Sequence, residues 1–154
     1  MGDLTKNFSM DEFVQSDTAD TLKIANTPTA KAEARLRHHA EIMQIIRDAV
    51  ARAIVLTNAY RNARVNAAVG GVPNSDHMNG DASDSRAAGL SALAYARLIA
   101  AMMKPRGKLH GKIDQLILET SRNIVHVSTA PRLRGQILTQ KGGPGSPFVA
   151  GLVP

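Results

Sequence analysis

Two residues with metal-binding side chains, His77 and Asp84, lie seven positions apart in a polar segment of the chain. Gly80 stands between them and lets the backbone turn, so a neutral imidazole and a carboxylate can converge on one cation. Zinc accepts such nitrogen and oxygen ligands, and a catalytic zinc site uses three protein ligands with a fourth position open to water. The spacing therefore makes both residues candidate ligands of a catalytic metal.

A third candidate ligand is His126, which lies in the β-branched run at residues 124–128. Because side chains alternate along a strand, Val125 and Val127 are expected to point into the core while His126 faces a cleft. A lone histidine at such a position is more often structural. The pattern therefore leaves both a packed histidine and a metal ligand open.

Hydrolysis at such a metal needs a base that is not itself a ligand. Glu119 ends the apolar run that precedes His126, and a hairpin between the two runs would bring these side chains together. Arg61 follows the first predicted strand and suits a two-pronged contact with a substrate carboxylate or an oxyanion. The alternatives are a charge at a hairpin edge for Glu119 and a surface salt bridge for Arg61.

Hydrophobic periodicity predicts the elements that must position these residues. Apolar residues at spacings of three and four predict a long helix over residues 29–51, and a second helix is predicted over 87–103. The polar residues 58–85 are predicted as a long functional loop. Strands are predicted from β-branched and apolar runs, at residues 53–57, 112–118 and 123–128. This order indicates an α+β fold in which a small antiparallel β-sheet packs with helices.

The two ends of the chain differ in composition from its centre. Ser9 and Glu12 have the spacing of a capping box, which predicts a short helical turn, and residues 14–27 are predicted to be irregular. Glycine and proline dominate residues 141–154, which predicts a loose or wrapping tail. The chain therefore divides into a single domain, residues 1–140, and this tail.

Charge and composition narrow the possible partners. The 154 residues include 19 Lys and Arg against 13 Asp and Glu, and this net charge of +6 favours anionic partners. Three Phe, two Tyr and no Trp are too few for a typical surface that stacks nucleic-acid bases, and the basic residues are scattered. The absence of Cys excludes disulfides and thiolate chemistry. No apolar run approaches the ~20 residues of a membrane span, and the N-terminus does not read as a secretory signal.

These residues together resemble the zinc D-alanyl-D-alanine carboxypeptidases of the peptidase M15 family, in particular a small branch found in phages and bacteria. The resemblance covers most of the chain. Its most specific part is the segment 75–84, Ser-Asp-His-Met-Asn-Gly-Asp-Ala-Ser-Asp, joined to a later Val-His-Val-Ser at 125–128. Further matching segments lie at residues 4–9, 26–28, 60–61, 65–71 and 114–117, and Glu119 also matches.

The resemblance implies a Hedgehog/DD-peptidase-like fold with one zinc ion (Zn2+) per chain. Its ligands would be His77, Asp84 and His126. Arg61 would act in catalysis and substrate binding by engaging the C-terminal region or the scissile carbonyl of the substrate. Ser75 would line the pocket and hydrogen-bond the substrate.

The resemblance also bears on the catalytic base. Some branches place an acidic residue three positions before the last histidine, where this chain has Asn123, which cannot accept a proton in that role. Other branches, including the Hedgehog domains, use a glutamate from the preceding strand, and Glu119 matches that arrangement. Leu118 and Ile124 stand where the branch usually has tryptophan, so the pocket walls and the substrate preference are expected to differ.

The implied function is zinc-dependent hydrolysis of peptidoglycan stem or cross-link peptides at or near D-amino acids, as by a carboxypeptidase or an endolysin. One alternative is a non-catalytic zinc-containing module, structural or wall-binding, such as a virion component, since fold does not imply function. Another is a nucleic-acid binder, which explains none of the histidine and aspartate placement. The protein is expected to be a monomer without a membrane span or a specific nucleic-acid partner. It would be made in the cytoplasm and reach the cell wall after lysis or on a particle.

Overall fold

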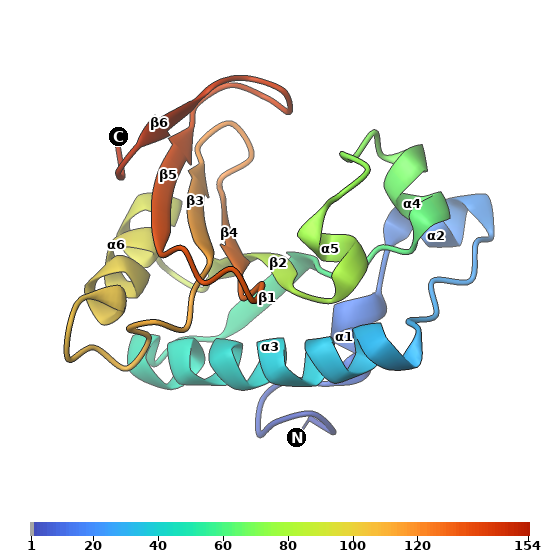
Figure 1. The fold of residues 1–154 in the computed structure, drawn as a ribbon, viewed down its shortest axis with the longest axis horizontal. Helices are drawn as coiled ribbons and strands as arrows, with labels where there is room; N and C mark the ends of the chain where they lie inside the picture. Colours follow the sequence, from blue (N-terminus) through green and yellow to red (C-terminus); the bar gives the residue numbers. More distant parts are fainter. Residues whose placement is uncertain (1) are drawn as a thin grey trace.

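The computed structural model describes residues 2–154 and has an α+β fold (Figure 1). One six-stranded sheet has the order β1-β2-β4-β3-β5-β6. The strands are β1 (Ile54–Asn58), β2 (Ala82–Ala87), β3 (Gln115–Glu119), β4 (Ile124–Ser128), β5 (Gln136–Gln140) and β6 (Phe148–Ala150). The helices are α1 (Met10–Val14), α2 (Asp17–Leu22), α3 (Ala30–Val50), α4 (Ala63–Ala68), α5 (Asp76–Asn79) and α6 (Ala92–Met103). Within the described residues, no helix combines the length and the apolar character needed to span a membrane.

The sheet is antiparallel at every pair except one. β3 and β4 form the predicted hairpin, and β2 pairs with β4 on its other side. β5 instead runs parallel to β3, so the chain leaves β4 and crosses to the far side of β3. The predicted antiparallel sheet packed with helices is confirmed in outline, with this one parallel pair added.

The long helix predicted from periodicity is α3, which lies along the bottom of Figure 1. Thr29 begins it as the N-cap, since its side chain accepts a hydrogen bond from the Ala32 N–H. The residues of its apolar stripe are all buried, namely Leu36, Ala40, Met43, Ile46 and Val50. Full burial of each larger side chain contributes about 1.5–3 kcal/mol, so this stripe anchors the helix to the core.

The side chains of β3 and β4 alternate between two environments. Val125 and Val127 belong to the buried core, as predicted, and α6 packs against β3, β4 and β2. Glu119 and His126 belong to the opposite set and line a cavity. The sheet therefore separates a packed apolar face from a face that carries polar side chains.

The segment 58–85 was predicted as a loop, and this prediction is wrong for most of its length. It contains α4 and α5, which depend on local caps rather than on long periodicity: Asn62 caps α4 and Ser75 caps α5. It also contains the first residues of β2, whose small polar sequence lacks β-branched residues. β2 forms because it pairs with β1 and β4 on its two sides, and such tertiary pairing overrides propensity.

Two further boundaries differ from the prediction. The segment 14–27 is not irregular throughout, because Ser16 caps the short helix α2. The second predicted helix begins at Ala92 instead of residue 87, since Ala87 ends β2 and Ser91 is the N-cap of α6. Both differences arise from capping residues, which decide where a helix starts.

The C-terminal segment holds two strands that the sequence did not predict. β5 pairs with β3, and β6, which lies inside the segment predicted as a loose tail, pairs with β5. Thr139 strengthens this hairpin, because its hydroxyl donates to the Gly151 carbonyl and accepts from the Val153 N–H. The division of the chain at residue 140 stays a prediction.

Asp114 fastens the crossover loop between β4 and β5 to the start of β3. Its fully buried carboxylate accepts hydrogen bonds from the side chains of Arg132 and Arg134 and from the Arg134 backbone N–H. Burial would raise the pKa of Asp114, but the hydrogen bonds from Arg134 and Arg132 outweigh it and lower the pKa to about 2. The carboxylate is thus a charged anchor for the loop that leads into β5.

Candidate active site

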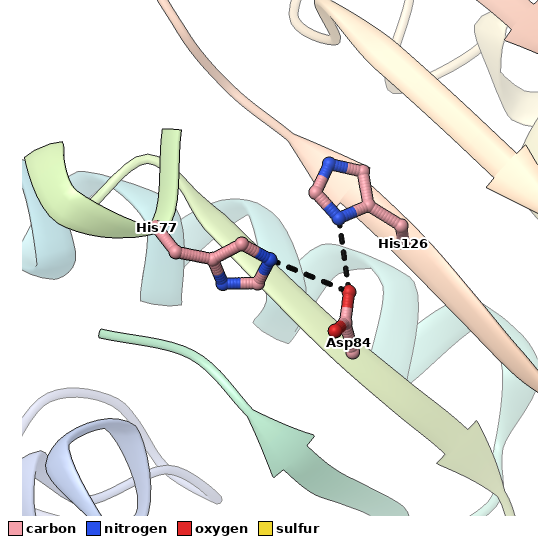
Figure 2. A group of neighbouring side chains, drawn as sticks. All are labelled: His77, Asp84 and His126. Atoms are coloured by element: carbon pink, nitrogen blue, oxygen red, sulfur yellow. Dashed lines mark hydrogen bonds and ion pairs between the residues drawn. The ribbon is translucent and has the colours of Figure 1, made fainter. Parts of the chain in front are cut away.

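The structure brings together the three residues predicted as metal ligands (Figure 2). His77 comes from α5, Asp84 from β2 and His126 from β4. Asp84 and His126 are direct partners in the β2–β4 register, which places them side by side on one face of the sheet. One ligand atom from each residue lies within 4.8 Å of the others, and this group can hold a metal ion. Their role as ligands stays a prediction.

One carboxylate oxygen is at the centre of this group. Asp84 Oδ1 lies 2.9 Å from His126 Nδ1 and 3.5 Å from His77 Nε2. Burial would raise the pKa of Asp84, but the two histidines outweigh burial and hold it well below its ordinary value. Asp84 is therefore ionised at neutral pH, which is the form that binds a cation.

The orientation of His77 is set by two earlier residues, Ser75 and Ala59. Ser75 caps α5 and accepts a hydrogen bond from the His77 backbone N–H. The Nδ1 atom of His77 lies 2.6 Å from the Ala59 carbonyl oxygen, which can only accept, so Nδ1 carries the hydrogen. Nε2 then directs a lone pair toward Asp84. A lone pair and an anionic oxygen facing each other suit a cation between them, so the donor set fits a metal.

Glu119 reaches the same cavity from the end of β3. Glu119 pairs with Ile124 and Ile117 pairs with His126, so Glu119 and His126 are diagonal neighbours on one face of the hairpin. The prediction that the hairpin brings them together is confirmed. Burial, reinforced by the negative charge of Asp84, raises the pKa of Glu119 above its ordinary value, although Arg122 opposes the shift. A carboxylate with a raised pKa suits a group that must accept and then release a proton.

Arg122, in the β3–β4 turn, was not predicted as a site residue. Its Nη1 lies 2.8 Å from Glu119 Oε2 and its Nη2 lies 3.3 Å from Asp84 Oδ2. One guanidinium thus bridges the candidate base and a candidate ligand. The sequence held one signal for this contact, because Arg122 lies three residues after Glu119. That signal is weak, since the direction of a side chain in a turn depends on the turn conformation.

Arg61 lies between β1 and α4 and lines the cavity, and its predicted contact with substrate stays a prediction. Burial lowers the pKa of Arg61, and among residues 2–154 its buried Nε has no hydrogen-bond partner. Its Nη2 donates to the Ser75 hydroxyl at 3.3 Å. Ser75 is buried beside it and does not belong to the described cavity wall, so its predicted contact with substrate stays a prediction.

The two histidines of α3 do not belong to the candidate ligand group. His38 is exposed, whereas His39 is fully buried and its two ring nitrogens contact the hydroxyls of Ser83 and Thr129. Burial lowers the pKa of His39 to about 3, so the ring is neutral. His39 is therefore a packed histidine that joins α3 to β2 through Ser83.

A cavity of about 670 Å³ contains the side chains of His77, Asp84 and His126. Three segments far apart in the sequence complete its walls. They are residues 16–18 at the start of α2, residues 69–72 between α4 and α5, and the β5–β6 hairpin. The buried ligand group is therefore accessible to a molecule that enters this cavity.

Comparison with known proteins gives one family. A family model described as Peptidase M15 matches residues 6–128, which is most of the chain and includes the candidate ligand group, Arg61, Glu119 and Arg122. No curated protein matches the chain significantly. The match agrees with the resemblance found in the sequence, and the α+β fold is compatible with it. The chain belongs to the Peptidase M15 family.

Proposed function

We propose that this protein is a zinc-dependent peptidase that hydrolyses stem or cross-link peptides of peptidoglycan at or near D-amino acids. One observation carries the proposal: in a member of a peptidase family, two histidines and an ionised aspartate converge in a cavity that also holds a glutamate. The proposed place of action is the cell wall, reached after lysis or by delivery on a particle. The basic charge of the chain suits that anionic setting.

Zinc is proposed because of the donor atoms. Two imidazole nitrogens and one carboxylate oxygen, from His77, His126 and Asp84, form a typical ligand set for catalytic zinc, whereas magnesium and calcium prefer oxygen alone. A bound zinc ion supplies Lewis acidity, which makes water a stronger acid and a carbonyl carbon a better electrophile. The remaining steps belong to the side chains of the protein.

Glu119 is proposed as the base. Arg122 holds its Oε2 atom, which leaves Oε1 to take a proton from the attacking water. The same oxygen then passes that proton to the leaving amine, so that the carboxylate is regenerated. Among the described residues, the buried Nε of Arg61 has no hydrogen-bond partner, and Arg61 lines the cavity. Both observations support its proposed contact with the substrate carbonyl or carboxylate.

The proposal is tested by elemental analysis of the purified protein together with a digest of isolated peptidoglycan, each with and without a chelator. We expect about one zinc ion per chain and release of peptides or D-alanine that stops when the chelator removes the metal. The released fragments identify the bond. Zinc without cleavage would favour the non-catalytic module, and a protein that binds no metal would contradict the proposal.

The bridge made by Arg122 leads to a separate prediction. Arg122→Ala is expected to lower zinc affinity and kcat, each roughly tenfold or more, because partners of a metal ligand typically contribute that much. Arg122→Lys should recover only part of the loss, since one ammonium cannot form the same planar contact with two carboxylates. Zinc competition titrations and steady-state kinetics measure both effects. The exposed Arg97→Ala is the control, and equal zinc affinity in Arg122→Ala and Arg97→Ala would exclude the supporting role.

A further inference from the structure

The β5–β6 hairpin forms one wall of the candidate active-site cavity. It contributes Gln140, Pro144, Gly145 and Phe148 to the lining. The Peptidase M15 match ends at residue 128, so this wall lies outside the part of the chain that the family model describes. Its chemistry is therefore a property of this chain and has to be read from its own residues.

Phe148 differs from the other two phenylalanines of the chain. Phe8 and Phe13 are 1% and 0% exposed, whereas Phe148, at the start of β6, is 53% exposed. Its neighbour Val149 is 45% exposed but points away from the cavity, because side chains alternate along the strand. An aromatic side chain left in water beside a buried charged site is available to cover apolar surface of a ligand.

Two exposed valines line the same cavity from the loop between α4 and α5. Val69 and Val72 are 43% and 61% exposed. In Figure 1 the tip of the β5–β6 hairpin points toward this loop, and residues of both segments line the cavity. Asn66 holds the loop, since its side-chain amide donates to the Val72 carbonyl and a side chain at Gly71 would collide with it. The valines are thus presented by a fixed loop.

The cavity therefore combines charged side chains with exposed apolar ones, and residues 16–18, Ser-Asp-Thr, add polar groups to its wall. Arg61, Glu119 and Arg122 lie among the lining residues together with the ligand group, while the two opposing loops offer aromatic and aliphatic carbon. Charged groups suit the polar backbone of a peptide, whereas the apolar side chains gain by covering carbon. The charged and the apolar side chains would recognise different parts of one peptide.

We propose that Phe148, Val69 and Val72 form an apolar subsite that binds the aliphatic side chain of a residue near the scissile bond. The inference rests on the proposed function, because it takes the occupant of the cavity to be a peptide substrate. The methylene chain of a diamino acid such as lysine meets this description. Its ammonium group would remain in water while its methylenes pack against the Phe148 ring.

The test measures binding without turnover. The zinc-loaded Glu119→Gln protein is titrated calorimetrically with a peptidoglycan stem pentapeptide that has lysine at its third position, and with a counterpart that has glycine there. Adding Phe148→Ala should raise the Kd for the lysine peptide about tenfold and leave the Kd for the glycine peptide nearly unchanged. Phe148→Leu should restore most of the affinity. Val149→Ala is the matched control, since it removes a side chain of the same strand that is 45% exposed, close to the 53% of Phe148, and does not line the cavity.

The second measurement is steady-state kinetics on proteins that keep Glu119 and can therefore turn over substrate. Phe148→Ala should raise KM for the lysine peptide about tenfold with kcat unchanged, because the subsite acts in binding alone. Equal Kd values for the parent and Phe148→Ala would overturn the subsite, and so would an equal loss for both peptides. If the zinc-loaded protein binds neither peptide, the proposed function fails and the subsite with it, whereas binding that ignores Phe148 overturns the subsite alone.

Discussion

Replacing His77 with alanine is expected to abolish zinc binding and peptide hydrolysis together. His77 offers a lone pair on Nε2 because Ala59 fixes the hydrogen on Nδ1, and no other described histidine joins Asp84 and His126 in the group. Loss of one of three protein ligands should weaken zinc binding roughly hundredfold or more. Hydrolysis should then fall to background, since the Lewis acid is lost with the metal.

Zinc affinity is measured by competition with a chromophoric chelator, and hydrolysis is measured on isolated peptidoglycan. His38→Ala is the control, because it removes an exposed imidazole from α3 and should change neither quantity. Thermal unfolding of the metal-free proteins shows whether the fold is retained. A His77→Ala protein that binds zinc as tightly as the parent would show that the ion is held elsewhere.

Glu119→Gln is expected to keep the zinc ion and lose turnover. Glutamine has nearly the same shape and its amide oxygen can still accept from Arg122, so the hairpin and the ligand group should stay in place. It cannot take a proton from water, and positioned general acid–base groups typically contribute 10²–10⁴-fold to rate, so kcat should fall by roughly that factor. The expected signature is therefore a loaded but inactive protein.

Elemental analysis and steady-state kinetics on the same preparation separate these two effects. Glu41→Gln, an exposed carboxylate on α3, is a suitable control and should retain full activity. Turnover by Glu119→Gln at the parent rate would mean that another group moves the proton. Loss of both zinc and activity would instead assign Glu119 a role in holding the metal.

Much of the candidate site could be predicted because its signals are local. Period-two alternation alone places His126 on the face opposite Val125, and the spacing of Glu119 from His126 implies a hairpin that joins them. The residue types made His77 and His126 candidate ligands, but the pairing that joins them was not local information. The resemblance to a known family implied the full ligand set, since the pairing of β2 with β4 has no signature in the small polar residues of β2.

The strands β5 and β6, which follow β4 and form one cavity wall, could not be predicted from the sequence for a different reason. Glycine and proline in residues 141–154 indicate turns, and composition cannot say that a three-residue strand will pair with a strand that was itself not predicted. Arg122 was missed because a turn residue has no periodicity. The turn also holds Asn123 at a positive φ of 52°, a conformation that the sequence pattern does not reveal.

The buried carboxylate of Asp114, just before β3, makes the stability of the β5–β6 cavity wall depend on pH. Protonation of Asp114 would weaken its hydrogen bonds to Arg132 and Arg134 and loosen the loop that leads into β5, and β5 supports the strand that carries Phe148. The pKa of Asp114 is about 2 in the folded chain against an ordinary value of 3.8, so its charge stabilises the fold fully above about pH 4. That stabilisation is lost progressively as pH falls from about 4 toward 2. The hairpin thus keeps its electrostatic anchor throughout the mildly acidic range, and proton uptake at this one carboxylate loosens it only in strong acid.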